Sequence, residues 1–171
     1  MPAVRDFRNF SFSSARIDRC GRHLGSKLYW KLYVIENTIR IVIHSVLTQQ
    51  LGANWWGVAL DPKLVPKVTG RRRSYIAKPN NASPGGSDIH LLYLGELTDI
   101  VRANSHQFVP VVPDANNWVA ILESIRVPRN LVGHMNFPNS FDRGAIEFAY
   151  SRLPSLLGHL AAHHIPVLIP K

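Results

Sequence analysis

The chain has 171 residues, of which 46% are hydrophobic and 18% are charged, and its formal net charge is +9 at pH 7. This composition is typical of one globular domain and excludes a disordered chain. No apolar run approaches the roughly 20 residues that cross a bilayer, and the polar start of the chain lacks the apolar segment of a secretory signal. Cys20 is the only cysteine, which excludes an internal disulfide framework. These features predict a cytoplasmic protein without a membrane partner.

The positive charge is concentrated in two segments. Residues 1–31 carry seven Lys and Arg against two Asp, and residues 61–78 carry six against Asp61. Two basic segments beside a nearly neutral body favour binding to a polyanion, although solubilising surface charge is an equally good interpretation. The second segment contains the run Arg71-Arg72-Arg73.

Residues 1–23 are expected to pack on the domain or to extend it. Between residues 24 and 47, apolar side chains recur at steps of three and four, which predicts a long helix that ends near Gly52. The residues of this stripe are Leu24, Leu28, Leu32, Ile35, Ile39, Val42 and Val46. Glu36, Asn37 and Arg40 fall on a different sector of the same helix. Because most of the remaining surface is apolar, we expect these polar groups to be partly buried and hydrogen-bonded.

Residues 61–88 contain four prolines and three glycines, which predicts a long basic irregular connection with a flexible tip at 80–87. A helix is then predicted over 89–102, with Asp88 as its N-cap. Another starts near Asn116 or Asn117, and Pro128 either kinks it or begins a new helix. A last helix starts at Asn139 or Ser140 and bends at Pro154. The sequence thus predicts an all-α bundle of about four to five helices over residues 24–162, followed by a tail over 163–171.

One hexapeptide, Arg129-Asn130-Leu131-Val132-Gly133-His134, carries groups suited to phosphodiester chemistry. Arginine is a fixed cation that grips phosphate with two donors, and histidine moves protons near neutral pH. On an ideal helix Asn130 and His134 share a face, whereas Arg129 and His134 are roughly 140° apart. The long arginine side chain closes part of that gap, or a second copy of the segment completes the set across a symmetric interface. The bare spacing also fits an ordinary capping or ion-pairing role.

Arg129-Asn130-x-x-x-His134 resembles the RNxxxH signature of the HEPN superfamily of helical bundles. Residues 28–40, LYWKLYVIENTIR, resemble the LYxxLYxIENxIR helix of one HEPN branch. That branch was first noted in a nuclear messenger-RNA surveillance endonuclease and is widespread in bacterial defence and toxin proteins. Residues 92–97, LYLGEL, resemble its middle helix. The likeness covers roughly residues 24–162.

The resemblance implies a metal-independent endoribonuclease without a cofactor, acting as a toxin or antiviral defence effector. The family's arginine and histidine correspond to Arg129 and His134, and its polar residue corresponds to Asn130. The RNA 2′-hydroxyl would attack the adjacent phosphorus, His134 would transfer protons, and Arg129 would stabilise the charged phosphorane. The products would be a 2′,3′-cyclic phosphate and a 5′-hydroxyl. The implied partners are RNA, a second copy that completes the cleft of a homodimer, and an antitoxin or other regulatory protein.

Glu36, Asn37 and Arg40 are expected to support this cleft, either in catalysis or as a buried network between helices. Arg71, Arg72 and Arg73 are the predicted RNA-binding residues. Some HEPN toxins carry a tyrosine two residues after the histidine, where an antitoxin modifies them, but this chain has Asn136 there.

Two rival interpretations are a non-catalytic RNA- or nucleotide-binding module and a protein-docking module. His159 and His163 have the spacing of metal ligands on a helix, but they lack an accompanying glutamate or cysteine, so no metal site is predicted.

Overall fold

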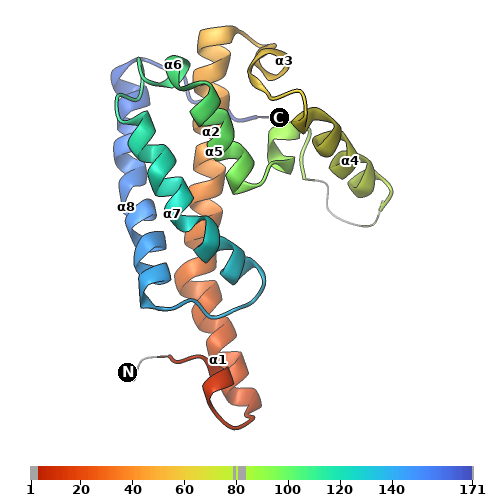
Figure 1. Cartoon of the computed structure of the whole chain (residues 1–171), viewed down its shortest axis with the longest axis vertical. Coiled ribbons are helices and arrows are strands. Elements are labelled where there is room, and N and C mark those ends of the chain that lie inside the picture. The colour runs from red at the N-terminus through yellow and green to blue at the C-terminus, as the bar shows by residue number, and fades with distance from the viewer. Residues whose placement is uncertain (1–3, 79, 81–83, 171) are drawn as a thin grey trace.

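The longest element is a helical rod formed by the first third of the chain (Figure 1). The computed structural model describes residues 4–78, 80 and 84–170. In the rod, α1 (Ser14–Leu24) continues through a π-helical turn (Gly25–Tyr29) into α2 (Trp30–Leu51). Gly52 ends α2 with φ +84°, in the left-handed region that glycine adopts without strain. The apolar stripe predicted along this helix is confirmed, because all seven of its residues are buried.

Four helices pack around one core. In this bundle α2 contacts α5 (Leu94–Ala103) and α8 (Ser140–Ala162), and α7 (Ala115–Gly133) packs against both α5 and α8. The short helix α6 (Ser105–Phe108) joins α5 to α7. The side chains with the lowest exposure come from all four helices, and they include Ile35, Ile43, Leu97, Leu122, Ile125 and Ile146. The predicted all-α bundle is therefore confirmed for the described residues.

Both of the last two long helices continue through a proline. Pro128 lies inside α7 and Pro154 inside α8, and each removes one backbone hydrogen bond from its helix. Pro128 therefore does not begin a separate helix. The end of α7 crosses α2 in Figure 1, where the chain turns back toward α8. The start of α8, predicted at Asn139 or Ser140, is confirmed: α8 begins at Ser140 and Asn139 is its N-cap. The Asn139 side chain accepts the backbone N–H of Asp142, whose carboxylate accepts the N–H of Asn139.

The prediction of irregular structure over 61–88 was wrong for Leu64–Ile76, which form α4. Pro66 is the third residue of α4, in the first turn, where a backbone N–H has no acceptor within the helix. A short helix α3 (Trp55–Ala59) precedes α4, which projects from the bundle as an arm in Figure 1. Residues 79 and 81–83 of the predicted connection and its tip lie outside the described residues.

The helix predicted to start at Ile89 begins later. Asp88–Leu91 form a 3₁₀ turn, and α5 begins at Leu94. Asp88 is therefore not the N-cap of α5, which is Tyr93, and its carboxylate forms an ion pair with Arg72 of the arm. The backbone N–H of Tyr93 instead donates to the carboxylate of Glu96 at 2.8 Å, which is the capping contact at the start of α5.

Both ends of the described chain are attached to the bundle. The N–H of Leu168 donates to Oγ of Ser45 at 2.8 Å, which holds the tail along α2. At the other end, Nη1 of Arg8 donates to Oδ1 of Asn136 at 3.1 Å, just after α7. The N-terminal segment thus both extends the bundle, through α1, and contacts the turn that follows the hexapeptide.

Candidate functional site

Glu36 is the centre of a polar network that joins α2 to α7. Glu36 is only 8% exposed, and its two carboxylate oxygens accept hydrogen bonds from two arginines. Nε of Arg129 donates to Oε1 at 2.6 Å, and Nη2 of Arg40 donates to Oε2 at 3.0 Å. A buried carboxylate needs such compensation, because removing it from water is costly. The predicted burial and hydrogen bonding of this sector of α2 are therefore confirmed.

Arg40 connects this network to the segment that leads into α5. Besides Glu36, it donates to Oδ1 of Asn37 at 3.3 Å and to the carbonyl oxygen of Leu92 at 3.0 Å. Asn37 is itself held by a bond from its amide to the carbonyl of Tyr33 at 2.8 Å. The predicted supporting residues thus lie together and beside Arg129. Their contacts position guanidinium groups rather than present a free acid or base.

Only one of the three guanidinium nitrogens of Arg129 is hydrogen-bonded to the described part of the protein. Its one hydrogen bond to another described residue is made by Nε, and its side chain remains 31% exposed. Nη1 and Nη2 are left without a protein acceptor among the described residues. A guanidinium anchored through Nε and open at both terminal nitrogens has the geometry that grips an anion with two parallel donors.

His134 and Asn130 are exposed near the end of the same helix. His134 is the C-cap of α7, and its backbone N–H donates to the carbonyl of Asn130 at 2.9 Å. Met135 follows with φ +58°, a left-handed conformation that is uncommon for a residue with a side chain. The His134 imidazole has no hydrogen bond to any other described side chain, so both of its nitrogens can reach a ligand.

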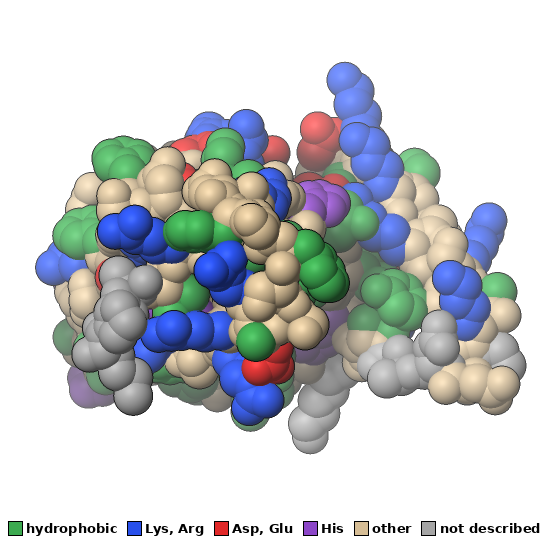
Figure 2. Space-filling model, turned by 90° about the horizontal axis from the view of Figure 1, so that it is seen from below, with side chains coloured by type: hydrophobic (Ala, Val, Ile, Leu, Met, Phe, Trp, Pro, Cys, Tyr) green, Lys and Arg blue, Asp and Glu red, His purple; other side chains and the backbone are tan. Residues whose placement is uncertain are grey.

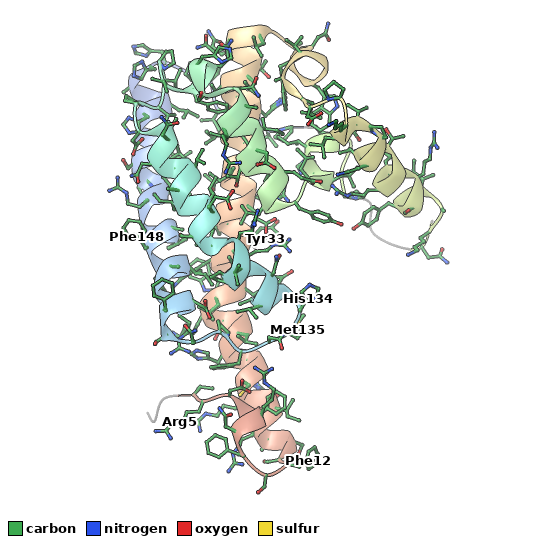
Figure 3. All side chains as sticks on the ribbon, in the orientation of Figure 1. Arg5, Phe12, Tyr33, His134, Met135 and Phe148 are labelled. Carbon is green, nitrogen blue, oxygen red and sulfur yellow. The ribbon has the colours of Figure 1, made fainter. Side chains whose placement is uncertain are left out.

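Two open clefts flank the Arg129 side chain. The first, about 860 Å³, is lined mainly by α2 and the end of α7, with Pro84 and His90 at its edge. The second, about 640 Å³, is lined by Tyr93, Leu94, Gly95, Glu96, Asp99, Arg126, Arg129, Asn130 and His134. Figure 3 shows His134, Met135 and Tyr33 on one side of the bundle and Phe148 on the opposite side.

The second cleft therefore unites the three residues of the predicted catalytic set. Asn130 and His134 share its wall, in keeping with their shared helix face. Arg129 borders the same cleft, but within one chain its guanidinium makes no hydrogen bond to His134. Each group is thus available to a bound ligand, and the ligand itself would have to bridge them.

The three arginines of α4 have different surroundings. Nη1 and Nη2 of Arg71 donate to the two oxygens of Glu96 at 2.6 and 2.7 Å, and Nη1 also donates to the carbonyl of Leu91 at 2.9 Å. Arg72 pairs with Asp88 at 2.6 Å. Arg73 is exposed and has no partner among the described residues. Helical periodicity turns successive side chains by about 100°, so the three arginines leave α4 in different directions.

Figure 2 views the molecule from the α1 end and shows Lys and Arg side chains on the bundle and on the projecting arm, with a hollow between the two. Arg71 and Arg72 hold the arm against the segment that leads into α5. The prediction that all three arginines bind RNA is not tested by these contacts, but they distinguish Arg73, which is free, from its two neighbours.

Glu96, which lines the second cleft, and His44 of α2 have shifted pKa values. Burial alone would raise the pKa of Glu96, but the Arg71 guanidinium and the Tyr93 N–H outweigh it and lower the pKa below its ordinary value. Burial lowers the pKa of His44, and the neighbouring His90 adds to the effect. Nδ1 of His44 accepts from the indole N–H of Trp55 at 3.1 Å, which requires the neutral ring.

Several cleft residues were not predicted as site residues, namely Tyr93, Arg126, His90 and Met135. Tyr93 does stand in the segment that resembles the HEPN middle helix, but nothing in its local sequence marked it as part of a site. Its position beside the hexapeptide depends on the packing of α5 against α7.

No match was found when the chain was compared with models of known protein families, with curated proteins and with solved structures. Among the described residues, no cluster of three or more histidine, cysteine or acidic side chains is arranged to hold a metal ion. None of the described helices combines the length and apolar character needed to cross a membrane.

Proposed function

We propose that this chain is a metal-independent endoribonuclease of the HEPN type. One arrangement carries the proposal: the guanidinium of Arg129, anchored by Glu36 through Nε, leaves its terminal nitrogens free beside a cleft that also presents Asn130 and His134. A phosphodiester offers the paired anionic oxygens that such a guanidinium binds. The same cleft presents an imidazole, the side chain that most often transfers protons in catalysis.

In the proposed reaction, the RNA 2′-oxygen forms a bond to the adjacent phosphorus and the bond from phosphorus to the 5′-oxygen breaks. The imidazole of His134 accepts the 2′-hydroxyl proton, and the leaving 5′-oxygen takes up a proton from an imidazolium or from water. Arg129 stabilises the additional negative charge of the phosphorane. The products are a 2′,3′-cyclic phosphate and a 5′-hydroxyl.

We infer further that the active form is a homodimer in which the clefts of two copies meet. Tyr33 and Met135 lie near the first cleft with 65% and 74% of their surface exposed. Exposed apolar side chains that gather on one face are typical of a surface buried by a partner. A second copy would bring a second His134 toward the substrate, so that one imidazole acts as base and the other as acid. A toxin or defence effector held in check by a regulatory protein is the corresponding cellular role.

The test is RNA cleavage by the full chain and by two variants, His134→Ala and Arg129→Ala. Each variant should lose roughly 10²- to 10⁴-fold in rate, the usual contribution of a general acid or base or of a charge-stabilising donor. The wild-type products should end in a 2′,3′-cyclic phosphate, cleavage should persist in EDTA, and an oligodeoxynucleotide of the same sequence should remain intact.

A matched control is His163→Ala, because His163 is also an exposed histidine that caps a long helix, at the end of α8. This variant should cleave at the wild-type rate. Wild-type cleavage by both His134→Ala and Arg129→Ala, with unchanged circular dichroism, would overturn the proposal.

A non-catalytic RNA-binding module is the second candidate. It is favoured by the absence of any hydrogen bond that orients the His134 imidazole among the described residues, since catalytic histidines are usually held by a second group. This alternative predicts saturable RNA binding that weakens with salt and no turnover at any enzyme concentration.

A further inference from the structure

Tyr93 has an exposed aromatic ring, and the guanidinium group of Arg71 packs against one face of it. The guanidinium carbon of Arg71 lies 3.9 Å from the centre of the Tyr93 ring, which places the cation on the face of the ring. The position of the Arg71 guanidinium group is fixed, because two of its nitrogens donate hydrogen bonds to Glu96 and one also donates to the carbonyl of Leu91. Glu96 in turn accepts the backbone N–H of Tyr93. These contacts form a closed ring of interactions that sets both the backbone and the side chain of Tyr93.

The exposure of Tyr93 points to an open ring face on the side away from Arg71. The residue is 56% exposed and lines the second cleft together with Asn130 and His134, whereas Arg71 is not part of that lining. A large exposed tyrosine on a flexible side chain would ordinarily sample several rotamers. Here the stacked guanidinium removes much of that freedom, so little further entropy is lost when a second flat group stacks on the open face.

We propose that Tyr93 is a stacking platform for an unpaired nucleobase next to the phosphate that Arg129 and His134 engage. The inference rests on the proposed function and deepens it, because it makes single-stranded RNA the substrate class. A base inside a duplex has both faces covered by its neighbours and cannot stack on a side chain, whereas an unpaired base can.

The chemistry of the cleft favours a base over other flat or charged groups. With a cation already on one face, the Tyr93 ring attracts a second cation weakly, which disfavours an arginine or lysine of a protein partner. The cleft volume of about 640 Å³ lies in the range of pockets that hold molecules of nucleotide size. Arg129, with its open terminal nitrogens, provides positive charge for a phosphate next to the base. Arg126 lines the same cleft but is paired with Glu123 at 3.6 Å.

The experiment measures binding in the His134→Ala background, so that the RNA stays intact, using the full chain and a fluorescein-labelled single-stranded RNA. Fluorescence anisotropy gives the Kd for RNA with a normal base and for RNA with one abasic nucleotide, moved along the strand. Adding Tyr93→Ala should weaken binding to the normal RNA by roughly 5- to 150-fold, the range for loss of one base–aromatic stack. The abasic RNA that lacks the stacked base should bind equally well with and without that change.

Tyr93→Phe keeps the ring and should bind within about twofold of the tyrosine form, which separates stacking from a hydroxyl contact. Phe148→Ala is the matched control, because Phe148 is 54% exposed but lies on the opposite side of the bundle (Figure 3). It should leave Kd unchanged. A duplex of the same sequence should not show the dependence on Tyr93.

The inference is overturned if Tyr93→Ala binds the normal RNA as tightly as the tyrosine form, or if it weakens binding to normal and abasic RNA equally. Its failure is distinguishable from failure of the proposed function. Cleavage that depends on His134 and Arg129 but not on Tyr93 would leave the endoribonuclease standing without the platform. A coupling between Tyr93 and one base, without cleavage by the wild-type chain, would leave the platform standing without the enzyme.

Discussion

Arg71 and Arg129 are both held by a glutamate, yet the two ion pairs leave very different groups for a ligand. Arg71 donates through both terminal nitrogens to Glu96, so the edge of its guanidinium that could grip a phosphate is occupied. Arg129 donates to Glu36 through Nε, and its terminal edge stays open. An arginine–glutamate pair therefore serves as a structural contact at Arg71 and leaves a candidate anion site at Arg129.

Charge alone therefore does not locate a nucleic-acid site in this chain. The arginine run on α4 is the most basic stretch of the chain, but two of its three members are engaged with carboxylates. Arg129 on α7 is the better candidate, because Glu36 orients it without occupying its terminal nitrogens.

The largest expected effect on stability is at Glu36. Glu36→Ala leaves Arg129 and Arg40 partly buried without their shared carboxylate, which should lower the free energy of unfolding by about 2–4 kcal/mol. Urea unfolding followed by circular dichroism measures this loss. Glu36→Gln should recover part of it, because the amide keeps the volume and one acceptor. An unchanged unfolding midpoint in Glu36→Ala would mean that the network does not stabilise the joint between α2 and α7.

A smaller loss is expected at Glu96, whose pair with Arg71 holds an arm rather than the core. The Glu96 side chain is more exposed than that of Glu36, at 18% against 11%, so water compensates more of the change. Glu96→Ala should lower the free energy of unfolding by about 1–2 kcal/mol, and amide exchange should increase mainly in α4. The exposed pair of Arg22 and Asp18 provides the control, since Asp18→Ala should barely change the free energy of unfolding. A Glu96 loss larger than the Glu36 loss would contradict the ranking.

The salt dependence of RNA binding should distinguish Arg73 from Arg72. Arg73→Ala removes a free cation, so the slope of log Kd against log salt for RNA binding should fall by about 1 if α4 contacts RNA. Arg72→Ala should leave that slope unchanged, because Arg72 is already paired with Asp88. Equal slopes for both variants and the wild type would remove α4 from the RNA-binding surface.

The smallest effect is a pH dependence from His44. Its pKa is lowered in the folded chain, so the unfolded chain takes up a proton at higher pH than the folded chain does. Stability is therefore complete above the ordinary value near 6.5 and declines as pH falls below it toward the folded pKa. His44→Gln keeps an acceptor for Trp55 and removes the titration. Its melting temperature should fall less than that of the wild type between pH 7 and pH 5, and parallel curves would show that His44 does not contribute.

Much of the bundle could be predicted from the sequence because the signals are local. The apolar stripe from Leu24 to Val46 determined which face of the first long helix is buried, since a period of 3.6 residues leaves no other face for it. The start of α8 was predicted to within one residue, at Asn139 or Ser140, and the end of α2 followed from Gly52. The hexapeptide stood out for the same reason, as its groups lie within six residues of one another.

Only the tertiary structure decided which charges are free. Glu36 and Arg129 are 93 positions apart, and Arg71 and Glu96 are 25 apart, so no local pattern relates them. The helix α4 forms despite Pro66 because the proline lies in its first turn, where no hydrogen bond is lost. The sequence determined the helices and the chemically capable residues, because periodicity and residue type are local properties. The fold alone determined whether each arginine has its terminal nitrogens bonded within the protein or open to a ligand, because its glutamate partner lies on a different helix.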